Sequence, residues 1–246
     1  MRSDNQYHYL GISSRLQMTN QDRTEKYHSY FQDRLTSIQN LENRLHKKIL
    51  LVIILDTLSR ARYPSVPRVK DRFLKMINED TKWEHASRVS LYRVLLSLTP
   101  AMGNALRKRA SESVSQWHEG TTPGLEVDPL ITDIEHLAST EDEMKLLRES
   151  THSSLLYLYR NHLVHEFREP GHGMEMDQRD TSPYYHGLTH LTARGKNNET
   201  WELVYPLGFF MHLVLTSLNS LRHYLLKNDL DPYSFYKFGT IWKRTV

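Results

Sequence analysis

The spacing of apolar residues between Asn20 and Arg62 constrains this fold most strongly. Ile49–Leu55 is apolar on every side, which predicts a central place in the core, and Pro64 and Pro67 end the stretch. We therefore expect one long helix here, at the centre of an all-α fold. Its apolar residues recur every three or four positions, as on one face of a helix: Tyr27, Tyr30, Phe31, Leu35, Ile38, Leu41, Leu45, Ile49 and Val52.

Further helices are expected on both sides of a loop at Glu119–Pro129, which holds two glycines and two prolines and is the best candidate boundary. Thr140 and Glu143 have the spacing of a capping box, in which a hydroxyl and a carboxylate bind the free amides of a helix start. The predicted helices cover Val69–Asn78, His85–Leu98, Ala101–His118, Thr140–Phe167 and Pro206–Lys227.

One segment alternates polar and apolar residues as a strand does. Thr200–Tyr205 has this pattern, and Tyr184–Leu191 is the expected partner strand. The predicted fold class is thus all-α: a bundle of five or more helices with a small β-hairpin in the region 184–205. We expect a flexible arm over 1–18, a helical N-terminal region over 19–130 that packs on the core, and a second helical region over 131–246.

Composition excludes several classes of site. There is no cysteine, so disulfides, thiolate zinc sites and cysteine nucleophiles are absent. The net charge of +3 permits contact with nucleic acid without requiring it. No apolar run approaches the roughly 20 residues that a bilayer needs, and the N-terminus lacks an apolar signal core, so we expect a cytoplasmic protein with no membrane contact. No glycine-rich phosphate loop, dinucleotide fingerprint or Gly-x-Ser-x-Gly elbow is present.

The segment with the clearest chemistry is Arg160–His165. On a helix, Asn161 and His165 share a face, and the long side chain of Arg160 can reach it. A histidine exchanges protons near neutral pH, and an arginine holds a phosphate with two hydrogen bonds. The helix is expected to end at Phe167, beside a long polar loop over 168–200. This pattern indicates an anion site, and the alternative is a solvated helix end where histidine caps free carbonyls.

The segment Tyr159–Arg168 resembles the signature of the HEPN superfamily. In that all-α superfamily an arginine, often followed by a polar residue, precedes a histidine by four to six positions. Arg160, Asn161 and His165 fill these positions. The resemblance covers about residues 140–227 and makes 131–246 a HEPN-like region, whereas residues 1–130 match no family pattern.

The resemblance implies a homodimer that cleaves RNA without a metal or other cofactor. His165 of the two chains would serve as general base and general acid, Arg160 would stabilise the phosphorane, and Asn161 would orient the histidine or the phosphate. His162 and Arg168 would contact the substrate. A defence or toxin-type role, with an antitoxin or other regulatory protein as partner, is typical of the family. The alternative function is a non-catalytic helical module that binds nucleotide, RNA or a protein partner.

Three other patterns compete with this interpretation. His162 and His165 could bind a metal if His172, His186 or His190 completed the ligand set, but dispersed surface histidines are the simpler interpretation. The basic residues 107–109 could contact phosphates, although such clusters are usually solvated helix faces. Aromatic side chains could stack on bases, although core packing is commoner: Trp201, Tyr205, Phe209 and Phe210.

Overall fold

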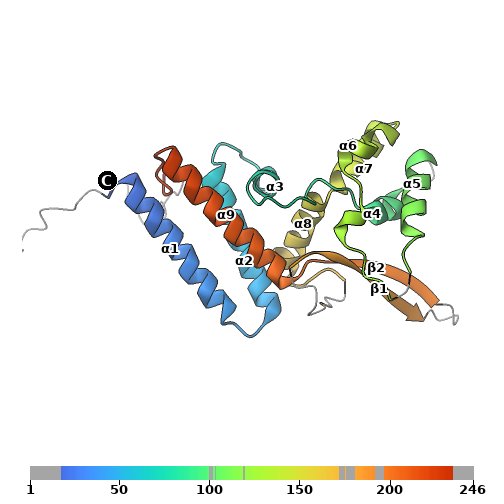
Figure 1. Cartoon of the computed structure of the whole chain (residues 1–246), viewed down its shortest axis with the longest axis horizontal. Coiled ribbons are helices and arrows are strands. Elements are labelled where there is room, and N and C mark those ends of the chain that lie inside the picture. Colours follow the sequence, from blue (N-terminus) through green and yellow to red (C-terminus); the bar gives the residue numbers. More distant parts are fainter. Residues whose placement is uncertain are drawn as a thin grey trace, which may run out of the picture.

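The computed structural model describes residues 18–99, 102, 104–118, 120–171, 175, 181–191 and 197–234. Within these ranges the chain is mostly helical with one small antiparallel sheet, as the sequence predicts (Figure 1). Of the expected arm over 1–18, residues 1–17 lie outside the described residues. The helices are α1 Asn20–Gln39, α2 Arg44–Arg62, α3 Val69–Glu79, α4 Leu91–Ser97, α5 Asn104–Val114, α6 Ile131–Ile134, α7 Glu141–Glu149, α8 His152–Asn161 and α9 Leu207–Lys227.

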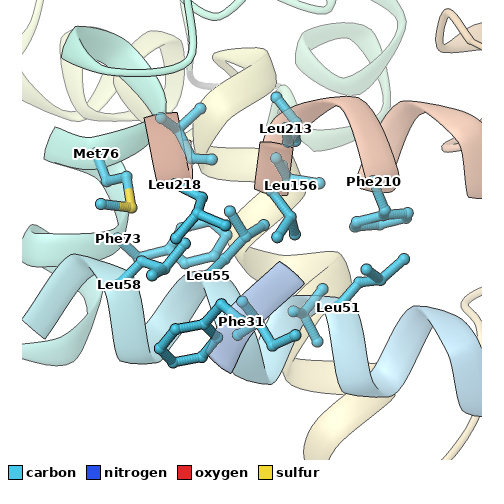
Figure 2. Close-up of a cluster of buried hydrophobic side chains, with 14 of the residues drawn as sticks. Phe31, Leu51, Leu55, Leu58, Phe73, Met76, Leu156, Phe210, Leu213 and Leu218 are labelled. Atoms are coloured by element: carbon cyan, nitrogen blue, oxygen red, sulfur yellow. The ribbon is translucent and has the colours of Figure 1, made fainter. Parts of the chain in front are cut away.

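The larger core lies between the long helices α1, α2 and α9, with α3 and α8 packed against them (Figure 1). Burial of each large apolar side chain contributes on the order of 1.5–3 kcal/mol. The core therefore fixes α8, which carries the Arg160–His165 segment, against α2 and α3. Figure 2 shows side chains from all five helices meeting in this cluster: Phe31, Leu51, Leu55, Leu58, Phe73, Met76, Leu156, Phe210, Leu213 and Leu218.

The predicted single helix over Asn20–Arg62 is wrong, because the chain turns back between α1 and α2. The side chain of Asn43 accepts a hydrogen bond from the His46 amide at 3.0 Å and starts α2. Asparagine favours such cap positions over helix interiors, which explains the break. The segment Ile49–Leu55 is also not buried on all sides: Leu50 and Ile53 are exposed, while the residues between and after them are buried.

Short polar residues likewise shorten or divide two other predicted helices. Instead of beginning at His85, the third helix starts at Leu91, where the Ser90 hydroxyl accepts from the Arg93 amide at 3.2 Å. The predicted helix 140–167 is divided at Ser150 and Thr151, and Thr151 caps α8. Thr140 caps α7 as expected, but Glu143 accepts from the Ser139 amide instead of completing the capping box.

The remaining predictions of elements agree more closely. Helices α3 and α9 match their expected ranges, and the fourth predicted helix, over 101–118, shortens to α5. The hairpin is confirmed: β1 Tyr184–Leu191 pairs antiparallel with β2 Asn197–Val204, with Tyr184 opposite Val204. A second, smaller core joins α4, α5, α6 and α7. The larger core draws on residues from both sides of position 130, and the proposed division at 130 stays a prediction.

A buried polar network connects α8 with the hairpin. Asp128 accepts hydrogen bonds from His152 at 2.9 Å, from the Tyr185 hydroxyl at 2.6 Å and from the Leu91 amide at 3.0 Å. Ser90 lies 2.7 Å from the same tyrosine hydroxyl. We call these four side chains, of Ser90, Asp128, His152 and Tyr185, the Asp128 network. In the part of the chain that the structure describes, no helix combines the length and the apolar character that spanning a membrane requires.

Candidate functional site

Helix α8 continues into a π-helical turn at His162–Glu166, which ends at Phe167 in a left-handed conformation with φ 54°. Turns of this wider kind occur frequently at functional sites. The expected helix end at Phe167 is thus present, although its last turn is not α-helical. Arg160 and Asn161 lie in α8, whereas His162 and His165 lie in the π turn.

The structure brings Arg160, Asn161 and His165 together. Arg160 Nη1 donates to Asn161 Oδ1 at 3.1 Å and lies 3.2 Å from His165 Nε2. A guanidinium can only donate, so Nε2 is the acceptor in this contact. His165 is exposed, while Arg160 is only 8% exposed. One imidazole therefore faces solvent beside a nearly buried cation.

Asp56 on α2 is a fourth member of this site. Its Oδ2 atom lies 2.9 Å from Arg160 Nε and also contacts Nη2, whereas Oδ1 is buried with no hydrogen-bond partner among the described residues. The carboxylate therefore holds one edge of the guanidinium, so that Nη1 points at Asn161 and His165. It also compensates the arginine charge. We call Asp56, Arg160, Asn161 and His165 the Arg160 cluster.

The electrostatics of Asp56 are set mainly by burial. Burial raises the pKa of this carboxyl above its usual value, and this effect outweighs the lowering by the hydrogen bonds and charge of Arg160. The charges of Arg72 and His165 lower the pKa further, but less. As the pH falls, Asp56 is therefore expected to take up a proton at a higher pH than an ordinary aspartate. Protonation would weaken its ion pair with Arg160.

The two predicted substrate contacts, His162 and Arg168, meet on one carboxylate. His162 Nδ1 lies 2.9 Å from Glu166 Oε1, and Arg168 Nη2 lies 2.5 Å from Glu166 Oε2. The hydrogen bond from His162, followed by the charge of Arg168, lowers the pKa of Glu166. The Arg168 side chain is more than half exposed. These residues form a second polar group next to the Arg160 cluster, in which the guanidinium of Arg168 is already paired.

Lys48 anchors the chain on both sides of the motif. Its buried ammonium donates to the Tyr159 hydroxyl at 3.1 Å and to Glu169 Oε2 at 2.7 Å, and it also contacts Glu175. Glu175 in turn accepts from the Leu207 amide at the start of α9 at 3.1 Å. Tyr159 precedes Arg160 and Glu169 follows Arg168, so this lysine fixes the motif at both ends.

The residues of the competing patterns are mostly buried, paired or outside the part of the chain that the structure describes. Among the described residues, no three histidine or acidic side chains are grouped so that they could hold a metal ion. His172 and the side chain of His190 lie outside the described residues. Tyr205, Phe209 and Phe210 are buried in the core, and Arg107 donates to the Thr99 carbonyl at 2.8 Å.

The structure also shows what sequence reasoning missed. Asp56 is the only charged residue in the run over 49–58, which is apolar apart from Asp56 and Thr57. A lone carboxylate in such a run requires a partner, because burying an unpaired charge is costly. That signal could have marked Asp56, although it would not have named Arg160.

No protein-family model matches the chain, and comparisons with curated proteins and with solved structures likewise gave no match. The resemblance to the HEPN superfamily therefore rests on the Arg160–His165 motif and its helical setting.

Proposed function

We propose that the protein is a metal-independent endoribonuclease of HEPN type. The observation that carries the proposal is the convergence of Asn161 and His165 on Arg160 Nη1, with His165 exposed to solvent. A cation and a histidine at one accessible point are the groups that phosphodiester cleavage by a neighbouring hydroxyl needs.

The reaction requires two histidines, which a homodimer with facing motifs supplies. His165 of one protomer takes the proton of the ribose 2′-hydroxyl as this oxygen forms a bond to phosphorus. The bond from phosphorus to the 5′-oxygen breaks, and His165 of the partner subunit donates a proton to that oxygen. The products carry a 2′,3′-cyclic phosphate and a free 5′-hydroxyl. Arg160 donates to the phosphoryl oxygens as their charge increases.

The resting hydrogen bonds suggest how substrate activates the site. His165 Nε2 accepts from Arg160, so its lone pair is occupied until Nη1 turns to another acceptor. A phosphate oxygen is such an acceptor, and its binding frees Nε2 to act as the base. Asp56 keeps the opposite edge of the guanidinium in place during this exchange. Asp56 is therefore a positioning residue in this proposal.

The second candidate is a non-catalytic helical module that binds nucleotide, RNA or a protein partner. The observation that favours it is the pairing of Arg160 with Asp56, because a guanidinium compensated by a carboxylate stabilises the charge of a transition state less strongly. A toxin-type or defence role, with an antitoxin as regulatory partner, belongs to the first candidate only.

Cleavage of labelled RNA in EDTA separates the candidates. The wild type is expected to cut, and His165→Ala to lose on the order of 100-fold or more of the rate. His223→Ala is the matched control, since His223 is an exposed histidine on α9. Equal cleavage by His165→Ala and wild type would overturn the nuclease. Retained RNA binding without any cleavage would support the binding module.

A further inference from the structure

An aromatic pocket lies between α4, α8 and the hairpin, and His162 of the motif forms part of its wall. Its volume is about 230 Å³, below the roughly 300–1,000 Å³ of pockets for drug-sized ligands. Leu96 and Leu158 are exposed and lie at this pocket, with 62% and 43% of their surface accessible. Five of the fifteen lining residues are aromatic: Tyr92, which is half-buried, and Tyr159, Tyr185, Trp201 and Tyr205, of which at most 9% of the surface is exposed.

Few polar groups line the pocket. Arg93 is exposed and lines both this pocket and a neighbouring one, whose lining also includes Lys70 and Asn161. Gly171 has a φ of +72°, and a Cβ atom there would lie 2.6 Å from the Glu202 carboxylate carbon. The positive φ favours glycine at this position, whereas the Glu202 side chain could move aside. An apolar wall with a few polar groups is the usual character of a small-molecule site.

Hydrogen bonds hold the aromatic walls in place without a ligand. The Trp201 amide donates to the Tyr92 hydroxyl at 3.0 Å, and the Tyr205 hydroxyl donates to the His152 carbonyl at 3.2 Å. The Tyr185 hydroxyl is fixed in the Asp128 network. Because these rings are already ordered, a flat ligand does not have to pay the entropy of arranging them.

We propose that the aromatic pocket binds one unstacked nucleobase, with Arg93 placed for the adjoining phosphate. Aromatic faces suit every base, and single-stranded RNA is recognised by splaying its bases onto such side chains. His162 lies three residues before His165, so the pocket would hold a nucleotide close to the scissile bond. The choice of RNA as the source of the base rests on the proposed function, whereas base binding itself does not.

Saturation-transfer NMR on the full chain tests the pocket, with adenosine, guanosine, cytidine, uridine and ribose 5-phosphate as probes. At least one nucleoside is expected to receive saturation at its base protons. Leu158→Trp fills the pocket and should lower the affinity for that nucleoside at least 10-fold, as measured by titration. Leu215→Trp is the matched control: Leu215 is 41% exposed on α9, and this variant should bind as wild type does.

Three results would overturn the proposal: no nucleoside signal at millimolar concentration, unchanged binding by Leu158→Trp, or a signal from ribose 5-phosphate alone, which would indicate an anion site. The nuclease proposal fails separately. Nucleoside binding that persists in His165→Ala, without RNA cleavage by wild type, would remove the nuclease and leave the pocket. Cleavage without nucleoside binding would do the reverse.

Discussion

The Asp128 network and the Arg160 cluster both join an aspartate to a histidine on or just after α8, yet they differ in how completely the aspartate oxygens are satisfied and in how far the histidine is exposed. Both oxygens of Asp128 accept hydrogen bonds, and Asp128 and His152 have no exposed side-chain surface, although His152 Nδ1 has no hydrogen-bond partner among the described residues. In the Arg160 cluster one oxygen of Asp56 has no partner among the described residues, and His165 is exposed. A closed network stabilises a fold, whereas an open one retains groups for a ligand.

The largest expected effect is on the closed network. Asp128→Ala removes the acceptor of three buried donors and leaves His152 Nε2 and the Leu91 amide unsatisfied, while the Tyr185 hydroxyl keeps only Ser90. The free energy of unfolding should fall by about 3–5 kcal/mol, which urea denaturation measures. A loss below about 1 kcal/mol would show that this network is not the structural one.

The second largest effect is expected on the rate of RNA cleavage. Arg160→Lys keeps the charge but cannot hold Asp56 with one edge while donating to Asn161 and His165 with the other. RNA cleavage should fall on the order of 100- to 1,000-fold, as for the loss of one transition-state donor. Arg62→Lys, another arginine paired with an aspartate, is the control and should cut at the wild-type rate. Full activity in Arg160→Lys would contradict the assigned role.

A smaller effect on stability is expected for Asp56→Asn, because burial of the charged carboxyl offsets much of the Arg160 attraction. The free energy of unfolding at neutral pH should differ from that of the wild type by about 1 kcal/mol or less. This variant exposes uncompensated positive charge, so RNA should bind more tightly and with a steeper salt dependence. Filter binding at several salt concentrations measures this, and weaker binding by the variant would be contrary to expectation.

The raised pKa of Asp56 also fixes the sign of a pH effect. The folded state holds the proton more tightly than the unfolded state, whose pKa is about 3.9. Wild-type stability relative to Asp56→Asn should therefore increase as the pH falls from neutral through the raised pKa toward that value. Unfolding curves across this range test the sign, and an advantage of the wild type that shrinks in acid would refute it.

The smallest effect is expected for Glu166→Gln, in the exposed group beside the Arg160 cluster. Its ion pair with Arg168 is exposed to solvent, where such pairs contribute little. The midpoint of thermal unfolding should match that of the wild type. A large drop would mean that the π turn depends on Glu166.

The sequence predicted what depends on local pattern. The apolar spacing identified most helices, the alternation at Thr200–Tyr205 identified the hairpin, and the fixed distances within Arg160–His165 placed three side chains together. It did not locate the breaks at Asn43, Ser90 and Thr151. A short polar residue can either cap a helix or sit on its solvated face, and only packing decides between these.

The ion pair between Asp56 and Arg160 could not be predicted from the sequence, for a different reason. Asp56 and Arg160 are 104 residues apart, and a single sequence carries no signal that joins them. The π turn was equally hidden, because the apolar spacing before it is the same for an α-helix. Two features of the site are therefore known only from the structure: the Asp56 carboxylate that holds Arg160, and the π turn that carries His165.

The most direct test of the open Arg160 cluster as a nuclease site is the identity of the RNA ends that it makes. We predict that ³¹P NMR or mass spectrometry of RNA treated in EDTA shows 2′,3′-cyclic phosphate ends with wild type and none with His165→Ala. Ends that carry a 5′-phosphate, or cyclic ends that are equally abundant with His165→Ala, would contradict it.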